Sequence, residues 1–251
     1  MGRSSSGDFV VVWHSIDQLA AGYTSVIGQR FSAAGAPLGS EFVVRVSGAG
    51  PAVAASSAGF VVTWAEGGAL DNEAVFARRY DGSGAPLGSA FRVDDGAAPL
   101  NAYSRIATDT TGNFVVVWDA FPSIMAQRYS GVSGAPLGQS FRVVTSGYHQ
   151  TPDVATTGPG SFTVAWRGIE DLSSFSDVYA QRYCGALAGD ADGNDVVNVA
   201  DVFWLINSLF AGGPQPVRGC DANGDGKTDV ADVFYLINFL FAGGKGPACT
   251  S

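Results

Sequence analysis

Oxygen-bearing side chains recur at a fixed spacing near the C-terminal end of the sequence. They occupy positions 1, 3, 5, 9 and 12 of two twelve-residue segments, 190–201 and 221–232, which begin 31 residues apart. At this spacing a loop can wrap a hard cation such as Ca²⁺, with the carbonyl of position 7 as a further ligand. The ligands predicted in the first segment are Asp190, Asp192, Asn194, Val196 (carbonyl), Asn198 and Asp201. Those predicted in the second are Asp221, Asn223, Asp225, Lys227 (carbonyl), Asp229 and Asp232.

The two segments differ in ways that predict different affinities. The second has four aspartates among its ligands, where the first has three. The second also has Gly226 at position 6, where the chain must turn sharply, whereas the first has Asp195 there. We therefore expect two calcium ions, with the tighter one in the second segment. The alternative is a pair of Asp- and Gly-rich turns that bind nothing.

A nearly identical apolar run follows each segment and predicts a helix. In the first run Val202, Leu205 and Leu209 form one stripe, enough to pack against the other helix. A second stripe remains on each helix, and a module of this size can hardly bury both. We predict that the second stripe either docks a partner or packs on the rest of the chain. Its residues are Val199, Phe203, Ile206, Phe210, Val230, Phe234, Ile237 and Phe241.

The paired loop–helix units resemble a type I dockerin, a module that binds two calcium ions and attaches bacterial secreted proteins to scaffolds that carry cohesins. The resemblance covers about residues 184–251, with Asp201 and Asp232 where a conventional EF-hand has Glu. It implies calcium binding and a cohesin-like partner. The sequence departs from the family at positions 10, 11, 17 and 18 of each unit, where cellulosomal dockerins usually have Ser or Thr and then basic residues as cohesin contacts. Those positions hold Val199, Ala200, Ile206 and Asn207, then Val230, Ala231, Ile237 and Asn238. Cohesin recognition is therefore not carried over automatically.

Three cysteines flank the loop–helix units. Two antiparallel units would bring the end of the second near the start of the first, which predicts a Cys184–Cys249 disulfide and a free Cys220. The pairings Cys220–Cys249 and Cys184–Cys220 are the alternatives.

A longer repeat fills residues 1–183. A Phe-Val-Val-X-Trp motif ends at Trp13, Trp64 and Trp118, and a related Phe-Thr-Val-Ala-Trp motif ends at Trp166. Each is followed by a segment similar to Ala-Gln-Arg-Tyr. Four short strands in about fifty residues are typical of a β-propeller blade. These motifs and segments resemble repeats of large bacterial secreted proteins. The first repeat lacks a leading strand and the last a final one, so we expect fourteen strands, or about three and a half blades.

We interpret this region as the C-terminal part of a longer propeller and expect an incomplete ring. The alternative is a small self-closing or open β-solenoid-like stack. The fold class expected for the whole chain is therefore mainly β, with a propeller-like region at 1–183 and a small α dockerin-like module at 184–251.

Charge and composition narrow the possible functions. A net charge of −9 argues against a nucleic-acid ligand. No apolar stretch reaches the ~18 residues of a membrane span. The sequence has no signal peptide, although a calcium module suits an extracellular or cell-surface protein, so we expect an N-terminal truncation.

Residues 1–183 offer little catalytic chemistry. His14 and His149 are isolated, and the acids of Asp94-Asp95 and Glu170-Asp171 lie in loops. The four repeated tryptophans occupy equivalent positions, so we expect them to pack in a core. The repeated arginines Arg30, Arg79, Arg128 and Arg182 suit pairing with turn carboxylates.

These observations favour a secreted, non-catalytic binding protein. Its partner would be a cohesin-like protein or its own propeller-like region, with a carbohydrate as a possible ligand. The alternatives are a dockerin-borne carbohydrate-active enzyme, such as a propeller glycoside hydrolase or lyase, and a structural, self-assembling extracellular protein.

Overall fold

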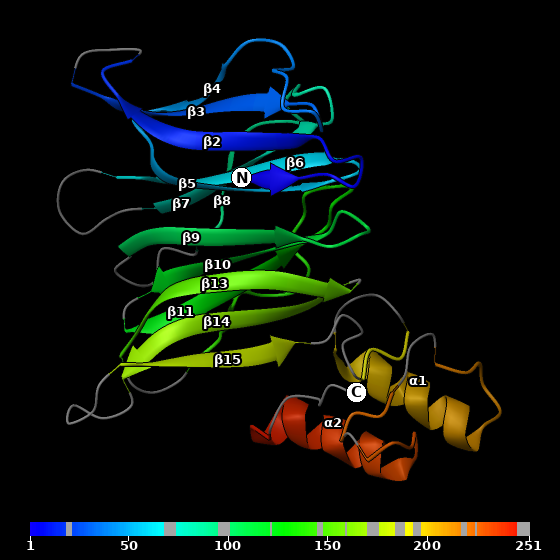
Figure 1. The fold of residues 1–251 in the computed structure, drawn as a ribbon. Coiled ribbons are helices and arrows are strands. Elements are labelled where there is room, and N and C mark those ends of the chain that lie inside the picture. The colour runs from blue at the N-terminus through cyan, green and yellow to red at the C-terminus, as the bar shows by residue number, and fades with distance from the viewer. Residues whose placement is uncertain are drawn as a thin grey trace. The chain divides into compact units, whose positions relative to one another are not determined.

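Among the residues that it describes, the computed structural model has four β-sheets followed by two helices (Figure 1). This confirms the predicted class, mainly β with a small α module. The residues described are 1–18, 22–67, 74–94, 101–120, 122–144, 148–158, 160–169, 176–183, 189–192, 197–216, 220–223 and 225–244. The β part and the helical part are described separately.

Each sheet contains strands that are neighbours in the sequence. The first has β1 (Gly2–Arg3), β2 (Phe9–Ile16), β3 (Thr24–Phe31) and β4 (Phe42–Val46). The second has β5 (Ala49–Ser56), β6 (Gly59–Glu66), β7 (Ala74–Asp81) and β8 (Phe91–Arg92). The third has β9 (Asn101–Thr108), β10 (Phe114–Ala120), β11 (Ser123–Tyr129) and β12 (Phe141–Arg142). The fourth has β13 (Tyr148–Gly158), β14 (Ser161–Ile169) and β15 (Asp177–Tyr183).

The expected strand count was wrong at the first repeat. Gly2 and Arg3 form β1, which pairs antiparallel with β2 through Gly2 and Val10. The described residues therefore contain fifteen strands rather than fourteen. A strand of two residues has no hydrophobic period, so the sequence pattern does not reveal it.

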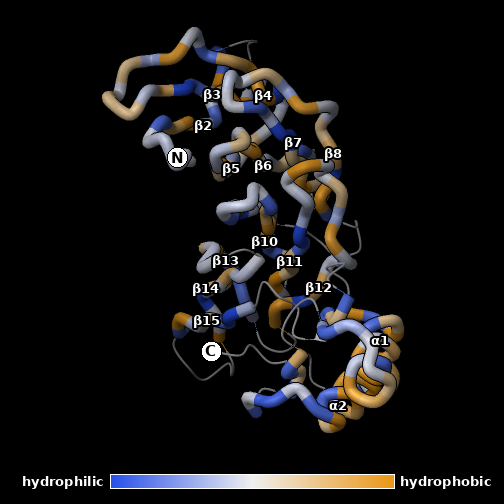
Figure 2. The backbone as a smooth tube through the Cα atoms, turned by 90° about the vertical axis from the view of Figure 1, so that its right-hand side faces the viewer, coloured by the Kyte–Doolittle hydropathy of each residue, from blue (hydrophilic) through white to orange (hydrophobic). Residues whose placement is uncertain are grey.

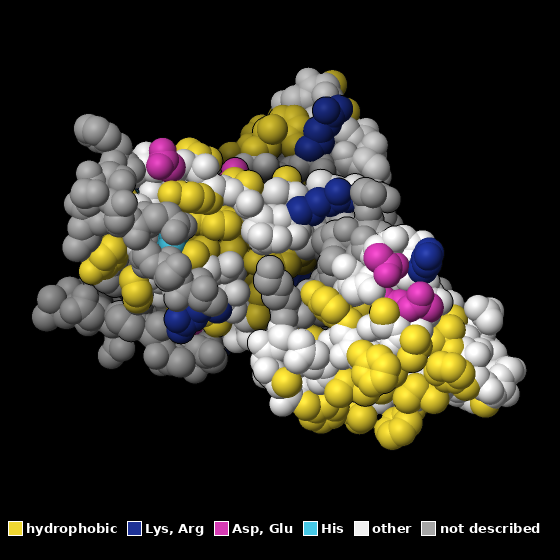
Figure 3. All heavy atoms as spheres, turned by 90° about the horizontal axis from the view of Figure 1, so that it is seen from below, with side chains coloured by type: hydrophobic (Ala, Val, Ile, Leu, Met, Phe, Trp, Pro, Cys, Tyr) yellow, Lys and Arg dark blue, Asp and Glu magenta, His cyan; other side chains and the backbone are white. Residues whose placement is uncertain are grey.

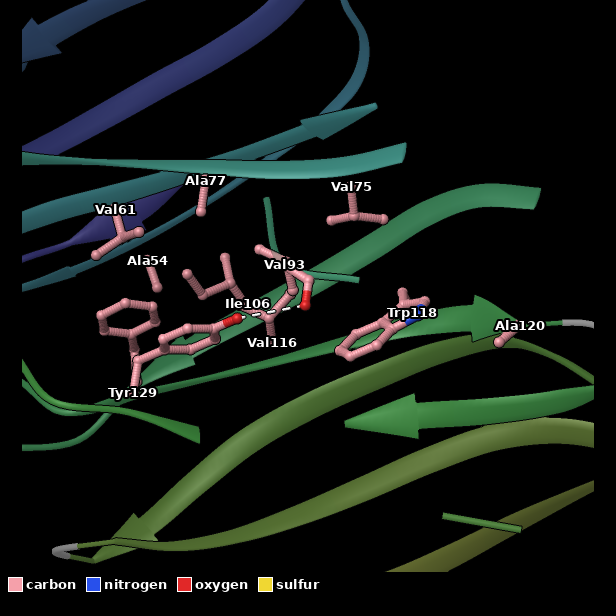
Figure 4. Close-up of a cluster of buried hydrophobic side chains, with 11 residues drawn as sticks. Ala54, Val61, Val75, Ala77, Val93, Ile106, Val116, Trp118, Ala120 and Tyr129 are labelled. Carbon is pink, nitrogen blue, oxygen red and sulfur yellow. Dashed lines mark hydrogen bonds between the residues drawn. The ribbon is translucent and has the colours of Figure 1, made fainter. Parts of the chain in front are cut away.

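Neighbouring sheets pack face to face through alternate side chains. Phe60, Val62 and Trp64 of the second sheet pack against Val10 and Val26 of the first. The third sheet repeats this contact on the second, with its own Phe, Val and Trp residues (Figure 4). Successive residues of a strand point to opposite faces, so the Phe-Val-Val-X-Trp motifs of the second and third sheets present their aromatic side chains to the preceding sheet. Trp64 and Trp118 are completely buried, which confirms that they are core residues.

The repeated arginines make a different contact from the one expected. Arg30 donates a hydrogen bond to the carbonyl oxygen of Ser83. Arg79 donates to the carbonyl oxygen of Val132, at 2.9 Å. Each arginine therefore contacts, through a backbone carbonyl, the turn just before a Gly-Ala-Pro-Leu segment of the next repeat (84–87 and 134–137). The predicted pairing with turn carboxylates was wrong for these two arginines.

The four sheets do not close into a ring, as predicted. Among the described strands, the pairs within each sheet account for all the sheet neighbours, and none joins the first sheet to the fourth. In the β part, strands β2–β4 lie at one end of the succession and β13–β15 at the other (Figure 1).

The helical part is built from α1 (Val199–Phe210) and α2 (Val230–Ala242). Asn198 and Asp229 cap them by accepting hydrogen bonds from the backbone N–H groups of Ala200 and Ala231, each at 2.7 Å. Apolar residues recur along both helices (Figure 2). The shared core is buried and confirms the predicted packing stripe. Its members are Ala191, Val202, Leu205, Cys220, Ala222, Val233 and Leu236. Neither described helix has the length and hydropathy needed to cross a bilayer.

Candidate calcium loops and apolar docking face

The position-12 carboxylate ties each loop to the start of its helix. Oδ1 of Asp201 accepts hydrogen bonds from the backbone N–H groups of Ala191 (2.8 Å) and Asp192 (3.3 Å). Its Oδ2 accepts a third from the N–H of Asn198, at 2.8 Å. These bonds join positions 2, 3 and 9 of the loop to the first helical turn. Asp201 is completely buried, which is tolerable for a carboxylate because it has these donors.

The second loop repeats the arrangement atom for atom. Asp232 accepts from the N–H groups of Ala222 (2.8 Å), Asn223 (3.1 Å) and Asp229 (2.8 Å). Both loops therefore have one scaffold, in which a single carboxylate fixes the loop entry and the helix start.

The first loop gathers three of its predicted ligands. Carboxylate oxygens of Asp190, Asp192 and Asp201 lie within 4.8 Å of one another. Oxygens bound to one Ca²⁺ at about 2.4 Å can be at most ~4.8 Å apart, so this cluster fits around one ion. Three carboxylates at this separation repel each other, and a divalent cation between them would relieve that repulsion. Asn194 and Val196 lie outside the described residues.

In the second loop the side chains hydrogen-bond to the loop's own backbone. Oδ1 and Oδ2 of Asp221 accept from the N–H groups of Asp225 (3.0 Å) and Gly226 (2.7 Å). Asp225 accepts in turn from the N–H of Lys227, at 2.9 Å. Gly226 has a φ of 86°, which explains why glycine suits position 6. Each carboxylate oxygen keeps a second lone pair, so these bonds leave room for a cation. An ion in this loop stays a prediction.

All eight residues of the predicted second stripe are exposed, and corresponding members of the two helices are exposed to the same degree. Phe203 and Phe234 are 65% and 66% exposed, and Ile206 and Ile237 are each 37% exposed. The remaining members are Val199, Phe210, Val230 and Phe241. Figure 3 shows hydrophobic side chains gathered on one side of the helical part. We call these eight residues the apolar docking face. Its role in binding stays a prediction.

The predicted disulfide cannot be placed, because Cys184 and Cys249 lie outside the described residues. Cys220 is a free, fully buried thiol, and burial raises its pKa to about 12. It is therefore a core residue rather than a reactive one.

Asp94 and His149 are buried and make contacts within the β part. Asp94 is buried and bonded to Arg92 at 2.6 Å, while Asp95, Glu170 and Asp171 lie outside the described residues. His149 is also buried, and its Nδ1 accepts a hydrogen bond from Trp166 Nε1 at 3.1 Å. His14 is exposed.

Sequence reasoning missed one unusual group, Asp119 at the end of β10. Its Oδ2 accepts a 3.3 Å hydrogen bond from the N–H of Thr151, while its buried Oδ1 has no partner among the described residues. Burial raises the pKa of Asp119 to about 6, against the lowering effects of the Thr151 hydrogen bond and the charge of Arg105. Asp119 directly follows Trp118, and nothing in the sequence around it indicates its burial or its raised pKa.

The raised pKa of Asp119 predicts a pH-dependent stability. The folded state holds the proton more tightly than the unfolded chain, so ionisation costs stability as pH rises from about 4 to about 6. A shift of about two pKa units corresponds to roughly 2–3 kcal/mol. Asp119→Asn should remove this contribution. Denaturant unfolding of both proteins from pH 4 to 7 checks it, and a wild type–variant difference that does not change with pH would contradict it.

Comparison with known proteins gives a family match for the C-terminal part of the chain. The family model for the type I dockerin domain matches residues 188–241, which confirms the dockerin resemblance of the C-terminal part. No curated protein sequence matches the chain.

Solved structures give a weaker likeness. The endo-arabinase from Bacteroides thetaiotaomicron is 11% identical, covers 70% of this chain and 70% of its own, and has a TM-score of 0.42. An alpha-L-arabinofuranosidase from Clostridium thermocellum is 9% identical, with 70% of this chain and 65% of that chain covered and a TM-score of 0.40. Because both TM-scores are below 0.5, neither enzyme's activity is assigned to this chain.

Proposed function

We propose that this protein is an extracellular, non-catalytic binding protein whose C-terminal module, loaded with two calcium ions, docks to a cohesin-like partner. The observation that carries the proposal is the equal exposure of the apolar docking face on both helices. The dockerin match supports docking, and the acidic cluster of the first loop supports calcium.

Calcium would set the orientation of the helices. Residues 184–251 contain eight aspartates against three basic residues, a charge of −5 before any ion binds. Two ions would bring the module near neutrality and offset the repulsion within each loop. Because Asp201 and Asp232 hold both the loop and the helix start, an ordered loop also orders the helix that carries the docking residues.

The apolar docking face suits a partner different from those of cellulosomal dockerins. Val, Ala, Ile and Asn stand where those modules use hydroxyl and basic contacts, and exposed Phe residues lie beside them on the same helices. We therefore propose a partner whose docking surface is apolar, because apolar contacts fill the core of stable interfaces. Residues 1–183 would be the attached cargo, with a carbohydrate as a possible ligand.

Binding in the presence and absence of calcium tests the proposal. The full chain should bind a member of a panel of cohesin modules in millimolar calcium, and chelation should weaken that binding at least about 100-fold. Calorimetry should also give two calcium ions per chain. Cohesin binding that is unchanged by chelation, or a single calcium ion, would contradict the proposal.

A further inference from the structure

Two clefts of the same build lie between neighbouring repeats of the β part. The central cleft, between the second and third repeats, has a volume of about 230 Å³. The outer cleft, between the first and second repeats, also has a volume of about 230 Å³. All residues that line the central cleft lie within 56–132, so neither the first nor the fourth sheet shapes it. Equivalent residues line both, namely Arg79, Leu87, Thr108, Gly112 and Gly131 in the central cleft and Arg30, Leu38, Ser56, Gly59 and Gly82 in the outer one.

Each cleft contains an arginine that the next repeat holds in place. Nη2 of Arg79 donates to the carbonyl oxygens of Gly131 and Val132. A Cβ atom on Gly134 would lie 2.8 Å from Arg79 Nη1, so glycine leaves the space that the guanidinium occupies. Arg30 repeats this arrangement with the carbonyl of Ser83 and with Gly84, the counterpart of Gly134. The two guanidinium groups are therefore positioned rather than free to move in solvent.

These guanidinium groups have no carboxylate partner among the described residues. The ion pairs found there, Arg45–Glu66 and Arg92–Asp94, involve neither Arg30 nor Arg79. The hydrogen bonds of Arg79 use only Nη2, which leaves the N–H groups of Nε and Nη1 available. No acidic side chain lines the central cleft, whereas Asp8 lines the outer one.

The turn acids beside these clefts are engaged elsewhere. Oδ1 of Asp81 accepts hydrogen bonds from the N–H groups of Ser83 and Ala85, and Oδ1 of Asp109 accepts from those of Thr111 and Asn113. Neither acid lines a cleft. The central cleft thus offers a fixed positive charge within a chain of net charge −9, and its complement is an anionic group.

We propose that the two clefts bind an acidic polysaccharide, with a carboxylate of the polymer on the guanidinium of each cleft. A planar guanidinium matches a carboxylate through paired N–H groups. Each cleft is smaller than the ~300–1,000 Å³ pockets that enclose drug-sized ligands, which suits a single sugar unit. A cleft repeated along the chain also suits a ligand whose own units repeat. This inference rests on the carbohydrate ligand of the proposed function and names its chemical class.

Charge changes at Val132 test the central cleft. Val132 lines this cleft and is 89% exposed, and any residue retains the carbonyl that Arg79 contacts. Val132→Asp should weaken binding of the full chain to hyaluronan and Val132→Lys should strengthen it, each about threefold to fivefold. Surface plasmon resonance in millimolar calcium measures both effects, which should shrink at high salt. Val46→Asp and Val46→Lys are the matched controls, because Val46 is 44% exposed and lines neither cleft.

Arginine variants test the carboxylate contact. Arg30→Gln and Arg79→Gln together should weaken binding at least about 10-fold. Arg78→Gln removes the same charge from the same strand and should bind like the wild type, because Arg78 lines neither cleft and donates to the carbonyl of Gly88. Methyl-esterified hyaluronan has the same backbone without the carboxylate charge and should bind at least about 10-fold more weakly.

Three results would overturn the inference. The first is no binding of the wild type to hyaluronan or to a polygalacturonate fragment. The second is equal binding of hyaluronan and its methyl ester, and the third is equal binding by Val132→Asp and Val132→Lys. Cohesin binding and calcium uptake, measured on the same samples, distinguish these failures from a failure of docking, since no residue changed here belongs to the helical part.

Discussion

Changing Phe203, Ile206, Phe234 and Ile237 to aspartate together should abolish docking, while changing only the first two should leave it largely intact. Both helices present the same side chains at nearly equal exposure, so each can offer the partner an equivalent surface. Loss of one surface removes one of two equal orientations and costs about twofold in affinity. When the surfaces of both helices are changed, charges lie in an apolar contact, and binding should weaken by more than about 100-fold.

Calorimetric titration of the partner into the two variants measures this difference. Calcium uptake serves as the internal control, since none of the four residues belongs to a loop. The variant with Phe234 and Ile237 changed is the matched counterpart and should behave like the first pair. If either pair alone abolished binding while calcium uptake stayed normal, docking through two equivalent helices would be wrong.

Asp232→Ala should unfold the helical part, whereas Asp225→Ala should only weaken calcium binding in the second loop. The Asp232 carboxylate accepts three backbone hydrogen bonds, and its removal leaves the N–H groups of Ala222, Asn223 and Asp229 without that acceptor. An unsatisfied donor costs about 1–3 kcal/mol when it is buried, as that of Ala222 is, and less when it is half-buried, as those of Asn223 and Asp229 are. The sum is still a large share of the stability of a small module. Asp225 is exposed, and its bond to Lys227 can be replaced by water.

Thermal unfolding with calcium and with a chelator separates the two effects. Asp232→Ala should lack the transition of the helical part even in saturating calcium, while Asp225→Ala should lose only the calcium-induced stabilisation. Equal destabilisation of the calcium-free protein by both changes would show that Asp232 has no special structural role.

The repeats made much of the architecture predictable. The position-12 aspartates, the packing stripe and the exposed second stripe could all be derived because each occurs twice in register. The core tryptophans were predictable for the same reason. A residue type that recurs at the same position of several repeats can be distinguished from one that is apolar there by chance.

The remaining features depend on contacts that no local pattern records. Arg30 and Arg79 bind carbonyl oxygens of the next repeat, and every residue has a carbonyl, so the sequence does not identify the acceptor. Asp119 is buried by packing of its sheet and is met by Thr151, which comes 32 residues later. The predicted Cys184–Cys249 pairing likewise depends on where the ends of the module lie in space.

The double role proposed for Asp201 and Asp232 would make calcium retention and docking reciprocal. If ion binding orders the helix that the partner grips, the partner must raise calcium affinity by the same factor that calcium raises partner affinity. A docked module would then retain its ions at lower external calcium concentrations than a free one. Calcium depletion that empties free modules would leave docked ones loaded, so attached and free modules would respond to different ranges of calcium concentration.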